Sequence, residues 1–335
     1  MIKPSSKVTL KDIAEKTGYS INTVSRALKS MPDISVETRN KILKVADQMC
    51  YIGNSIASSL RSGSSRTIAI IVGDISNPHF ATIIRNIVNI MSKNHYNTFI
   101  YNTCEKGNYE QEAIRSAIRQ NVDGILICPT QKDKNNIELL KSSHIPFVLF
   151  GRHTGDADIN SVVLNDVLGG YIATKHLLEL GCRNIAFINA KKYISSALER
   201  LEGYKQALTE FGVAFQDTHI MSIDLEDNYD NWENMKYQFC HKLNFDGIVA
   251  FSDIFALRIK EMLKSHDFRS VNSEQIPIVS FDNIVETFPL PISMTSISHA
   301  DSNMSIVASQ LLLDRIKKKG DPNQIVLNVK LYLRN

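Results

Sequence analysis

A short stretch near the N-terminus carries side chains of the types that read the edges of DNA bases. Residues 20–26 have the sequence S-I-N-T-V-S-R. Arg26 can donate two hydrogen bonds to guanine, Asn22 can pair in the same way with adenine, and Ile21 can press against a thymine methyl group. Any one of them is also an ordinary surface residue, so the prediction of a base-reading face rests on their occurring together on one helix.

Other polar side chains around this stretch are of the kind that hold a phosphate or cap a helix. Hydroxyl, amide and ammonium groups contact the DNA backbone, where they fix the register without reading the sequence. Small hydroxyl residues also precede helices, where they accept backbone N–H groups. The residues to which both interpretations apply are Thr9, Ser20, Thr23, Ser25, Asn40 and Lys41.

Three short helices are predicted to position these side chains. Thr9, Ser20 and Ser35 each precede an apolar pattern of helical spacing and can cap the helix that follows. Gly18 lies in the short connection between the first two helices, where a positive φ lets the second helix turn sharply across the first. Residues 1–50 therefore indicate an all-α helix-turn-helix DNA-binding domain, whose second helix would enter the major groove.

The charge of the chain is divided unevenly, which favours the same interpretation. Residues 1–66 hold 11 Lys and Arg against 5 Asp and Glu, a net charge of +6. The remaining residues hold 27 against 30, a net charge of −3, so the whole chain carries +3. A basic segment on a slightly acidic body suggests a polyanionic partner, although a solvated charged surface is the simpler alternative.

Residues 8–28, V-T-L-K-D-I-A-E-K-T-G-Y-S-I-N-T-V-S-R-A-L, resemble the signature of the LacI/GalR family of bacterial transcription regulators. The motif is long, and the resemblance continues through nearly the whole chain. It implies a homodimer that binds a double-stranded DNA operator. It also implies a second domain of the periplasmic-binding-protein-like α/β fold, in which two lobes bind a small-molecule effector.

Residues 51–65 are predicted to form a linker that becomes ordered only with a partner. They contain six serines and two glycines, and such a segment buries too little apolar surface to fold alone. The resemblance implies a hinge helix that folds when two subunits sit on DNA. Asn54, Ala57 and Leu60 would contact the DNA there, with Leu60 wedged between base pairs in the minor groove. Packing of Leu60 on the neighbouring domain is the alternative. Family hinges often carry proline where this chain has Gly53, which predicts a looser free hinge.

From residue 66 onward, short β-branched runs alternate with helix-length amphipathic segments, which is typical of an α/β fold with buried parallel strands. The runs predicted as strands are TIAIIVG, YNTFIYN, DGILICP, PFVLFG, NIAFIN, DGIVAF and PIVSFD. Two pairs of segments resemble each other: residues 122–128 match 245–251, and residues 145–151 match 276–282. These echoes suggest two lobes of related design within residues 66–335.

The resemblance implies how the chain is shared between the two lobes. One lobe is expected near residues 67–162 and 299–320, and the other near 163–296 and 324–332, with three connections crossing between them. In an open parallel sheet, ligands bind outside the carboxyl ends of the strands. Two lobes that face each other with these ends would form a cleft, and rotation about the crossovers would close it.

Polar and aromatic side chains that follow the predicted strands are the candidate ligand contacts. Two of them also match the family pattern, because Arg200 begins an R-x-x-G-[YFW] stretch that ends at Tyr204, and Asp282 follows a late strand. The resemblance implies that both bind the effector. The full effector-binding set that we predict is Asp74, Asn77, His79, Phe80, Arg152, Ser196, Arg200, Trp232, Asp253 and Asp282.

Several of these residues also have a simpler explanation. Polar residues at strand ends often cap the next helix, and Asp253 in particular can be such a cap. Trp232 can stack on the apolar face of a sugar ring, or it can pack against a helix. Arginine and aspartate beside an aromatic ring suit a carbohydrate, and nucleobases or other small polar metabolites need nearly the same groups.

Patterns of catalysis and metal binding are missing from the sequence. It contains no G-x-S-x-G elbow, no G-x-x-x-x-G-K-[ST] loop, no H-E-x-x-H and no G-x-G-x-x-G after a strand. Its five cysteines lack the spacing of a zinc site. We therefore expect neither an enzyme nor a bound cofactor. No uncharged apolar run reaches about 18 residues and no apolar segment follows Met1, so a cytoplasmic protein without a membrane span is expected.

The sequence therefore predicts a DNA-binding transcription regulator. On the resemblance, the expected function is repression of carbohydrate-utilisation genes from a near-palindromic operator, with release by a small sugar. A nucleobase or a protein corepressor, such as a phosphocarrier protein, is the alternative effector, because the sequence does not identify the ligand. A sugar-binding receptor shares the fold of the body, but the basic helix-turn-helix segment argues against it.

Overall fold

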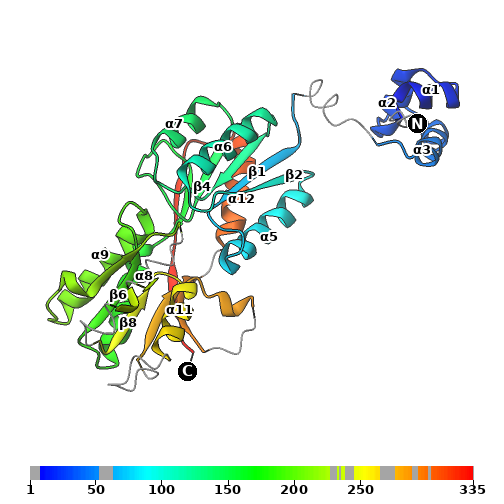
Figure 1. Ribbon diagram of the computed structural model, residues 1–335. Helices are drawn as coiled ribbons and strands as arrows, with labels where there is room; N and C mark the ends of the chain where they lie inside the picture. Colours follow the sequence, from blue (N-terminus) through cyan, green and yellow to red (C-terminus); the bar gives the residue numbers. More distant parts are fainter. Residues whose placement is uncertain are drawn as a thin grey trace, which may run out of the picture. The chain divides into compact units, whose positions relative to one another are not determined.

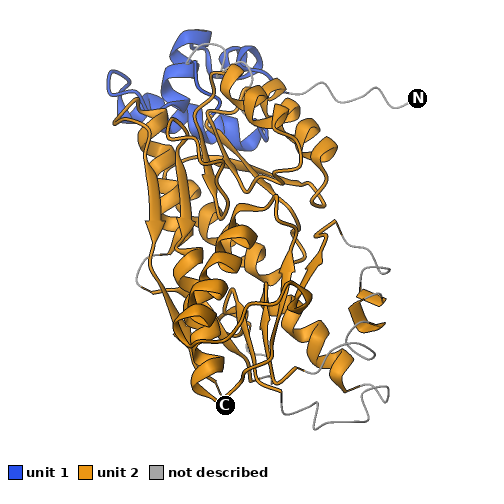
Figure 2. Ribbon diagram, turned by 90° about the vertical axis from the view of Figure 1, so that its left-hand side faces the viewer, with its two compact units in different colours: residues 1–65 blue, residues 66–335 orange. Residues whose placement is uncertain are grey.

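The computed structural model describes residues 8–52, 63–226, 232–233, 235–237, 245–264, 276–288, 293–300 and 303–334. The chain divides into two compact units, residues 1–65 and residues 66–335, which Figure 2 distinguishes by colour. The division falls where the linker expected from the sequence meets the α/β body.

Three helices form the described part of the first unit, as predicted. They are α1 (Leu10–Thr17), α2 (Ile21–Leu28) and α3 (Val36–Gln48). Thr9, Ser20 and Ser35 are their N-caps, and each side chain accepts a hydrogen bond from the backbone N–H three residues on. Gly18 ends α1 in the left-handed conformation, with φ at 77°, which allows α2 to start in a new direction at once.

A small core joins these three helices. Ile13, Val24 and Ile42, one from each helix, are fully buried, and Ala27 and Ala46 pack beside them. Because the apolar side of α2 is used in this contact, its polar side remains for solvent or for a partner.

The second unit contains two sheets, shown in Figure 1 with helices on both faces of each. The strands of the first sheet are β1 (Thr67–Val72), β2 (Asn97–Asn102), β3 (Gly124–Ile127), β4 (Phe147–Phe150), β5 (Ser161–Leu164) and β11 (Gln324–Leu327). Those of the second are β6 (Ile185–Ala190), β7 (Ile220–Ile223), β8 (Gly247–Ala250), β9 (Ile278–Phe281), β10 (Thr295–His299) and β12 (Val329–Tyr332). Each of the seven segments predicted as a strand overlaps one of these strands.

The helices described in the second unit cover both sheets. They are α5 (Pro78–Lys93), α6 (Gly107–Arg119), α7 (Asn135–Ser142), α8 (Asp166–Glu179), α9 (Ser195–Glu210), α11 (Asp253–Leu263) and α12 (Met304–Ile316), with short 3-10 helices η1 (Asp217–His219) and η3 (Ile284–Glu286). Ile68 and Ile70 of β1 pack with α5 and α12, whereas Ala69 and Ile71 face α6 and α7. Burial on both faces explains why β1 is apolar without alternation.

The two sequence echoes occupy matching places in the two sheets. The strand orders are β11-β5-β4-β3-β1-β2 and β12-β10-β9-β8-β6-β7. Residues 122–128 contain β3 and residues 245–251 contain β8, which is the fourth strand in each order. Residues 145–151 and 276–282 contain β4 and β9, the third strand in each. The prediction of two lobes of related design is therefore confirmed.

One part of the predicted division between the lobes is wrong. The sequence predicts that residues 324–332 lie in the second lobe, but β11 pairs in parallel with β5 at the edge of the first sheet, with Ile325 opposite Val162. Only β12 belongs to the second sheet, where it runs antiparallel to β10. The two strands are short and similar in composition, so only their pairing reveals that the chain changes lobe at Asn328.

Three segments cross between the lobes and are hydrogen-bonded to one another. The chain passes from β5 to α8 at Asn165, from β10 to α12 through Ala300, and from β11 to β12 at Asn328. The N–H of Asn165 donates to the carbonyl of Leu327 at 2.9 Å, and the N–H of Ala300 donates to the carbonyl of Asn328 at 2.9 Å. The last crossover therefore joins the other two.

Helices α8 and α9 touch backbone to backbone because glycines lie at their contact. A Cβ atom on Gly203 would lie 1.9 Å from the carbonyl oxygen of Val167, and one on Gly170 would lie 2.1 Å from that of Arg200. Gly169, the preceding residue of α8, is closely packed as well, because a Cβ atom there would lie 2.9 Å from the Phe281 ring. The contact holds Arg200 of α9 directly beside α8.

Replacing Gly203 by alanine should destabilise the second unit. The new methyl group would overlap backbone atoms of α8, so we expect the free energy of unfolding to fall by about 3 kcal/mol. Gly107→Ala is the matched control, because Gly107 begins α6 and an added Cβ there has no neighbour within 3.6 Å. Its stability should stay the same or rise by up to about 1 kcal/mol. Urea unfolding followed by circular dichroism measures both, and equal loss in the two variants would contradict the close helix contact.

Candidate functional site

The second helix of the first unit has a buried face and an open face. Val24 and Ala27 are fully buried against the other two helices. Ile21 is 49% exposed, and Asn22 beside it is exposed as well. Helix α2 therefore presents these two side chains at its N-terminal end, which is the part of a recognition helix that meets base edges.

The hydroxyl groups of Thr9 and Ser20 cap α1 and α2, so the capping interpretation of these two residues is confirmed. The N–H of Thr9 donates to Asp12 Oδ2 at 2.7 Å, and the N–H of Asp12 donates to Thr9 Oγ1 at 3.4 Å. Ser20 Oγ accepts the N–H of Thr23 at 3.1 Å. N-cap groups lie at the positive end of a helix, where a phosphate also binds favourably. DNA contacts by these residues and by Ser25 stay predictions.

Arg26 forms a two-pronged ion pair with Asp33, in the turn that follows α2. Its Nε donates to Asp33 Oδ2 at 2.9 Å, and its Nη2 lies 2.7 Å from Oδ1. The hydrogen bond from Arg26 holds the pKa of Asp33 below its ordinary value, and the same pair raises the pKa of Arg26. A guanine contact therefore requires the guanidinium to exchange this carboxylate for the base. The contact stays a prediction.

The remaining predicted DNA contacts are of two kinds. Asn40 and Lys41 are exposed on α3, where the Lys41 ammonium lies 5.3 Å from the centre of the Tyr19 ring. The predicted hinge contacts, which lie outside the described residues, are Asn54, Ala57 and Leu60.

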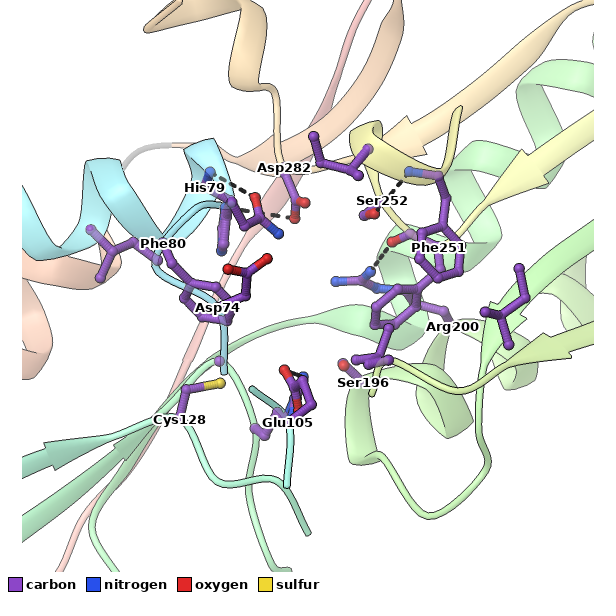
Figure 3. A pocket seen from close by; sticks show the side chains of 18 of the residues that line it. Asp74, His79, Phe80, Glu105, Cys128, Ser196, Arg200, Phe251, Ser252 and Asp282 are labelled. Carbon is purple, nitrogen blue, oxygen red and sulfur yellow. Dashed lines mark hydrogen bonds and ion pairs between the residues drawn. The ribbon is translucent and has the colours of Figure 1, made fainter. Parts of the chain in front are cut away.

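In the second unit, a cavity of about 190 Å³ lies between the two lobes, outside the carboxyl ends of their strands. Figure 3 shows side chains from both lobes directed into it. All the predicted ligand contacts line this cavity except Asp253. From the first lobe they are Asp74, Asn77, His79, Phe80 and Arg152, and from the second lobe Ser196, Arg200, Trp232 and Asp282.

Arg200 is held by protein groups on several sides. Its Nε donates to Asp166 Oδ1 at 2.7 Å, and its Nη1 donates to the carbonyl of Phe251. The guanidinium carbon lies 3.9 Å from the centre of the Phe281 ring and 4.8 Å from that of Phe251. Burial raises the pKa of Asp166, and the charge of Arg200 opposes this shift. Arg200 is therefore a fixed hydrogen-bond donor at the cavity wall, as Figure 3 shows.

Asp282 and His79 come from different lobes and face each other in the cavity. His79 Nδ1 lies 3.6 Å from Asp282 Oδ1. Burial, together with the charge of Arg200, lowers the pKa of His79 to about 4, so the imidazole is neutral near pH 7. Burial raises the pKa of Asp282 to about 7. Asp282 also has φ at 104°, which side chains other than glycine rarely adopt and which is typical of functional sites.

Asp74 and Asn77 shape the loop between β1 and α5. Asp74 Oδ1 accepts the backbone N–H of Ser76 at 2.8 Å and its hydroxyl at 2.7 Å. Asn77 is the N-cap of α5 and accepts the N–H of His79 at 3.0 Å. These bonds confirm a capping role for Asn77, and they fix the Asp74 carboxylate with one oxygen unused by the turn. Figure 3 shows that carboxylate directed into the cavity.

Asp253 is not part of the cavity wall, so its predicted place at the ligand is wrong. Its carboxylate is fully buried and accepts hydrogen bonds from the hydroxyls of Ser280 and Ser296, at 2.5 and 2.8 Å. The backbone N–H of Ile284 also donates to it, at 2.8 Å. Asp253 is the first residue of α11, whose N-cap is Ser252. Its side chain follows a strand as predicted but points into the lobe, where it joins α11 to β9 and β10.

Trp232 lines the cavity and also packs on α11, so both of its interpretations apply. Its ring centre lies 5.0 Å from that of Phe255, edge to face, and the guanidinium carbon of Arg258 lies 5.1 Å from the indole. Phe80 of the first lobe is a second aromatic wall residue. Such a wall can stack on the apolar face of a sugar ring.

Glu105 lines the cavity but is absent from the predicted set. Arg152 Nη1 and Nη2 donate to its Oε2 and Oε1, at 2.9 and 2.8 Å, and Nη1 also donates to the carbonyl of Pro129. Both side chains of this ion pair are buried. Glu105 follows β2 by three residues, and an acid shortly after a strand is the same signal that identifies Asp74.

Polar contacts join the two lobes beside the cavity. Lys132 Nζ lies 3.0 Å from Asp224 Oδ1 and 2.5 Å from Glu226 Oε2. Burial alone would lower the pKa of Lys132, but the bonds to Glu226 and Asp224 raise it above its ordinary value. The N–H of Ser195 donates to Gln131 Oε1 at 2.9 Å. The observed arrangement of the lobes is therefore fixed partly by charged groups at the cavity rim.

The polar groups of the cavity are hydrogen-bond donors and acceptors beside aromatic rings, which suits reversible binding of a small polar ligand. Among the residues that the structure describes, no three His, Cys, Asp or Glu side chains gather as a metal site would require. Within those same residues, none of the helices has the length and apolar character needed to span a bilayer.

Two family models match the chain. Residues 9–54 match the model for bacterial regulatory proteins of the lacI family. Residues 65–334 match the model for periplasmic binding proteins and the sugar binding domain of the LacI family. The first match covers the three-helix unit, and the second covers both lobes.

Individual relatives are similar over nearly their full length. The ribose operon repressor of Halalkalibacterium halodurans is 29% identical over 327 residues, which are 97% of this chain and 96% of that protein. The HTH-type transcriptional repressor PurR of Histophilus somni is 26% identical, over 95% of each chain. Among solved structures, a LacI family transcriptional regulator from Enterococcus faecium with bound ribose is 26% identical, with a TM-score of 0.68. That match covers 80% of this chain and 97% of the other.

Asp282→Asn should remove a pH dependence from the stability of the protein. The folded state holds the Asp282 proton up to about pH 7, whereas an unfolded aspartate releases it near 3.8. Between these values the unfolded state binds fewer protons, so the contribution of Asp282 to stability falls as the pH rises. Asparagine does not titrate. The melting temperature of the variant minus that of the wild type should therefore increase between about pH 5 and about pH 7.5. A constant difference would show that Asp282 ionises normally in the folded protein.

Proposed function

Because the chain belongs to the LacI family of bacterial regulatory proteins, we propose that it represses transcription by binding a near-palindromic operator as a homodimer and leaves the operator when a small sugar binds. In this proposal residues 1–50 read DNA, residues 51–65 form the hinge, and residues 66–335 bind the effector and the second subunit. The protein acts in the cytoplasm, where the operator is, and it carries no catalytic step.

The cavity between the lobes is the observation that carries the effector part of this proposal. It combines a fixed guanidinium, Arg200, with the carboxylates of Asp74 and Asp282 and with aromatic rings. Charged hydrogen-bonding groups and ring faces are what a polyol needs, because hydroxyls bond the former and C–H groups stack on the latter. The names of relatives agree, since one is a ribose operon repressor and another was solved with ribose bound.

The exposed end of α2 supports the DNA part of the proposal. Ile21 and Asn22 are available to base edges, and the N-caps of α1 and α2 are available to phosphates. A family regulator of this kind meets two half-sites related by the two-fold axis of its dimer.

A ligand between the lobes can control the DNA affinity only by favouring one arrangement of the lobes over another. The cavity has this property, because His79 and Asp74 come from one lobe and Arg200 and Asp282 from the other. A ligand that contacts all four changes the free energy of one lobe arrangement relative to the rest. We propose that this arrangement sets the distance between the two hinges of the dimer, and so their ability to fold on DNA.

Asn22→Ala should weaken binding in a sequence-dependent way. The operator is first obtained by selecting duplexes from a random library with the purified protein. Loss of the amide should reduce affinity for that operator by about 1–3 kcal/mol and relax the preference at one base pair of each half-site. Asn40→Ala on α3 is the matched control, since a phosphate contact there should weaken binding to all sequences equally. Equal behaviour of the two variants would exclude base reading by Asn22.

A sugar that binds the cavity should raise the melting temperature of the protein, because it binds only the folded state. Asp74→Asn should weaken that binding about tenfold or more, because a charged hydrogen bond is replaced by a neutral one while the turn to Ser76 is kept. Asp133→Asn is the control. Asp133 accepts the N–H of Asn135 in a similar turn away from this cavity. Identical sugar affinities in both variants would exclude Asp74 from the site.

The same thermal screen distinguishes the alternative effectors. Nucleobases and a phosphocarrier protein belong in it beside the sugars. Stabilisation by one of these, without a response to any sugar, would replace the sugar in the proposed mechanism and leave the DNA part intact.

A further inference from the structure

The two buried arginines of the cavity wall are each neutralised by a carboxylate of the protein itself. In the first lobe Arg152 is paired with Glu105 by two hydrogen bonds, and in the second lobe Arg200 is paired with Asp166. All four side chains are nearly excluded from solvent. Neither guanidinium therefore carries an uncompensated positive charge toward a ligand.

The ion pair between Glu105 and Arg152 requires a strained backbone at Glu105. Cys104 and Glu105 both have positive φ, at 49° and 56°, a region that side chains other than glycine seldom occupy. Gly73 provides the space for the carboxylate, since a Cβ there would lie 2.0 Å from Glu105 Oε1. The ends of β1, β2 and β4 thus cooperate to put an acid on Arg152. Strain that is maintained in this way is typical of a functional feature.

Other carboxylates face the cavity with no lysine or arginine bound to them by a described ion pair. Asp74 uses one oxygen in its turn and directs the group inward, and Asp282 meets only the imidazole of His79. The low pKa of His79, about 4, leaves that ring neutral. The third arginine of the wall, Arg258, lies over the Trp232 ring. The cavity therefore offers acceptors for hydroxyl groups, whereas its two buried arginines are already paired with carboxylates of the protein.

We propose that Glu105, by occupying Arg152, makes this cavity selective for uncharged sugars and excludes their phosphorylated or carboxylated forms, an inference that rests on the sugar-responsive function proposed above. A neutral sugar donates hydroxyl hydrogen bonds to Asp74 and Asp282 and accepts from Arg200. A phosphate group in the same space would lie near the carboxylate of Asp74. It would also lose its hydration without gaining a bidentate arginine partner, which is strongly unfavourable.

The test measures the affinity of the full chain for matched pairs of ligands by calorimetry. The probes are ribose and ribose 5-phosphate, glucose and glucose 6-phosphate, and glucose and glucuronate. For the sugar that binds, we expect the charged form to bind at least about 100-fold more weakly. Stronger or equal binding of the charged form would overturn the selectivity while leaving sugar binding in place. Absence of binding by every neutral probe would count against the sugar-responsive function itself, and with it the inference.

Glu105→Gln identifies the residue responsible. It should raise the affinity for the phosphorylated form relative to the neutral form by about tenfold or more, because it releases the charge of Arg152. Glu112→Gln is the matched control, since Glu112 pairs with Arg119 on the surface of α6, and it should leave the ratio unchanged. The double variant Glu105→Gln/Arg152→Gln should lose the gain.

A ratio in Glu105→Gln equal to that of the wild type would overturn the role of Glu105. The wild-type comparison of neutral and charged ligands needs no variant, so it decides the selectivity even if Glu105→Gln does not fold.

Discussion

The buried ion pair between Arg200 and Asp166 is the interaction on which the ligand cavity depends. It forms because α8 and α9 meet at Gly170 and Gly203, which leaves the two helices no side chains to hold them apart. If the helices separated, the guanidinium would be buried without a counter-charge, a strongly destabilising situation. The same contact directs the first turn of α9, with Ser196, toward the cavity. The packing of one helix pair thus determines the polar wall of the second lobe.

The first lobe reaches an equivalent result with different residues. There the arginine follows β4, and its acid comes from a left-handed turn after β2 rather than from a helix. The two sheets share one strand order, and the echoes in the sequence lie at the same strands. The lobes are therefore alike in backbone plan but differ in how each neutralises its buried charge. This difference decides which groups remain for a ligand.

The features that the sequence predicts correctly depend on local patterns. Thr9, Ser20 and Ser35 mark the starts of helices, because each side chain accepts a hydrogen bond from the backbone N–H three residues later. Strands buried on both faces are recognised as continuous apolar runs. The errors come from long-range geometry. Asp253 follows a strand as a ligand contact would, but its side chain turns inward to Ser280 and Ser296. Only its pairing with β5 shows that β11 belongs to the first sheet. The linear sequence also does not show that Asp33 and Glu105 each pair with an arginine.

The last crossover has a mechanical consequence. Asn328 alone separates β11 from β12, so these strand ends stay within about 7 Å of each other, and its neighbours Asn165 and Ala300 are tied to the same segment. These ties favour a swing of the lobes about the crossovers over a sliding motion. The cavity lies at the carboxyl end of β1, whereas the chain enters the lobe at the opposite end, about 20 Å away. A small change of angle at the ligand would therefore become a larger displacement at the end of the first lobe, where the chain leaves for the DNA-reading unit.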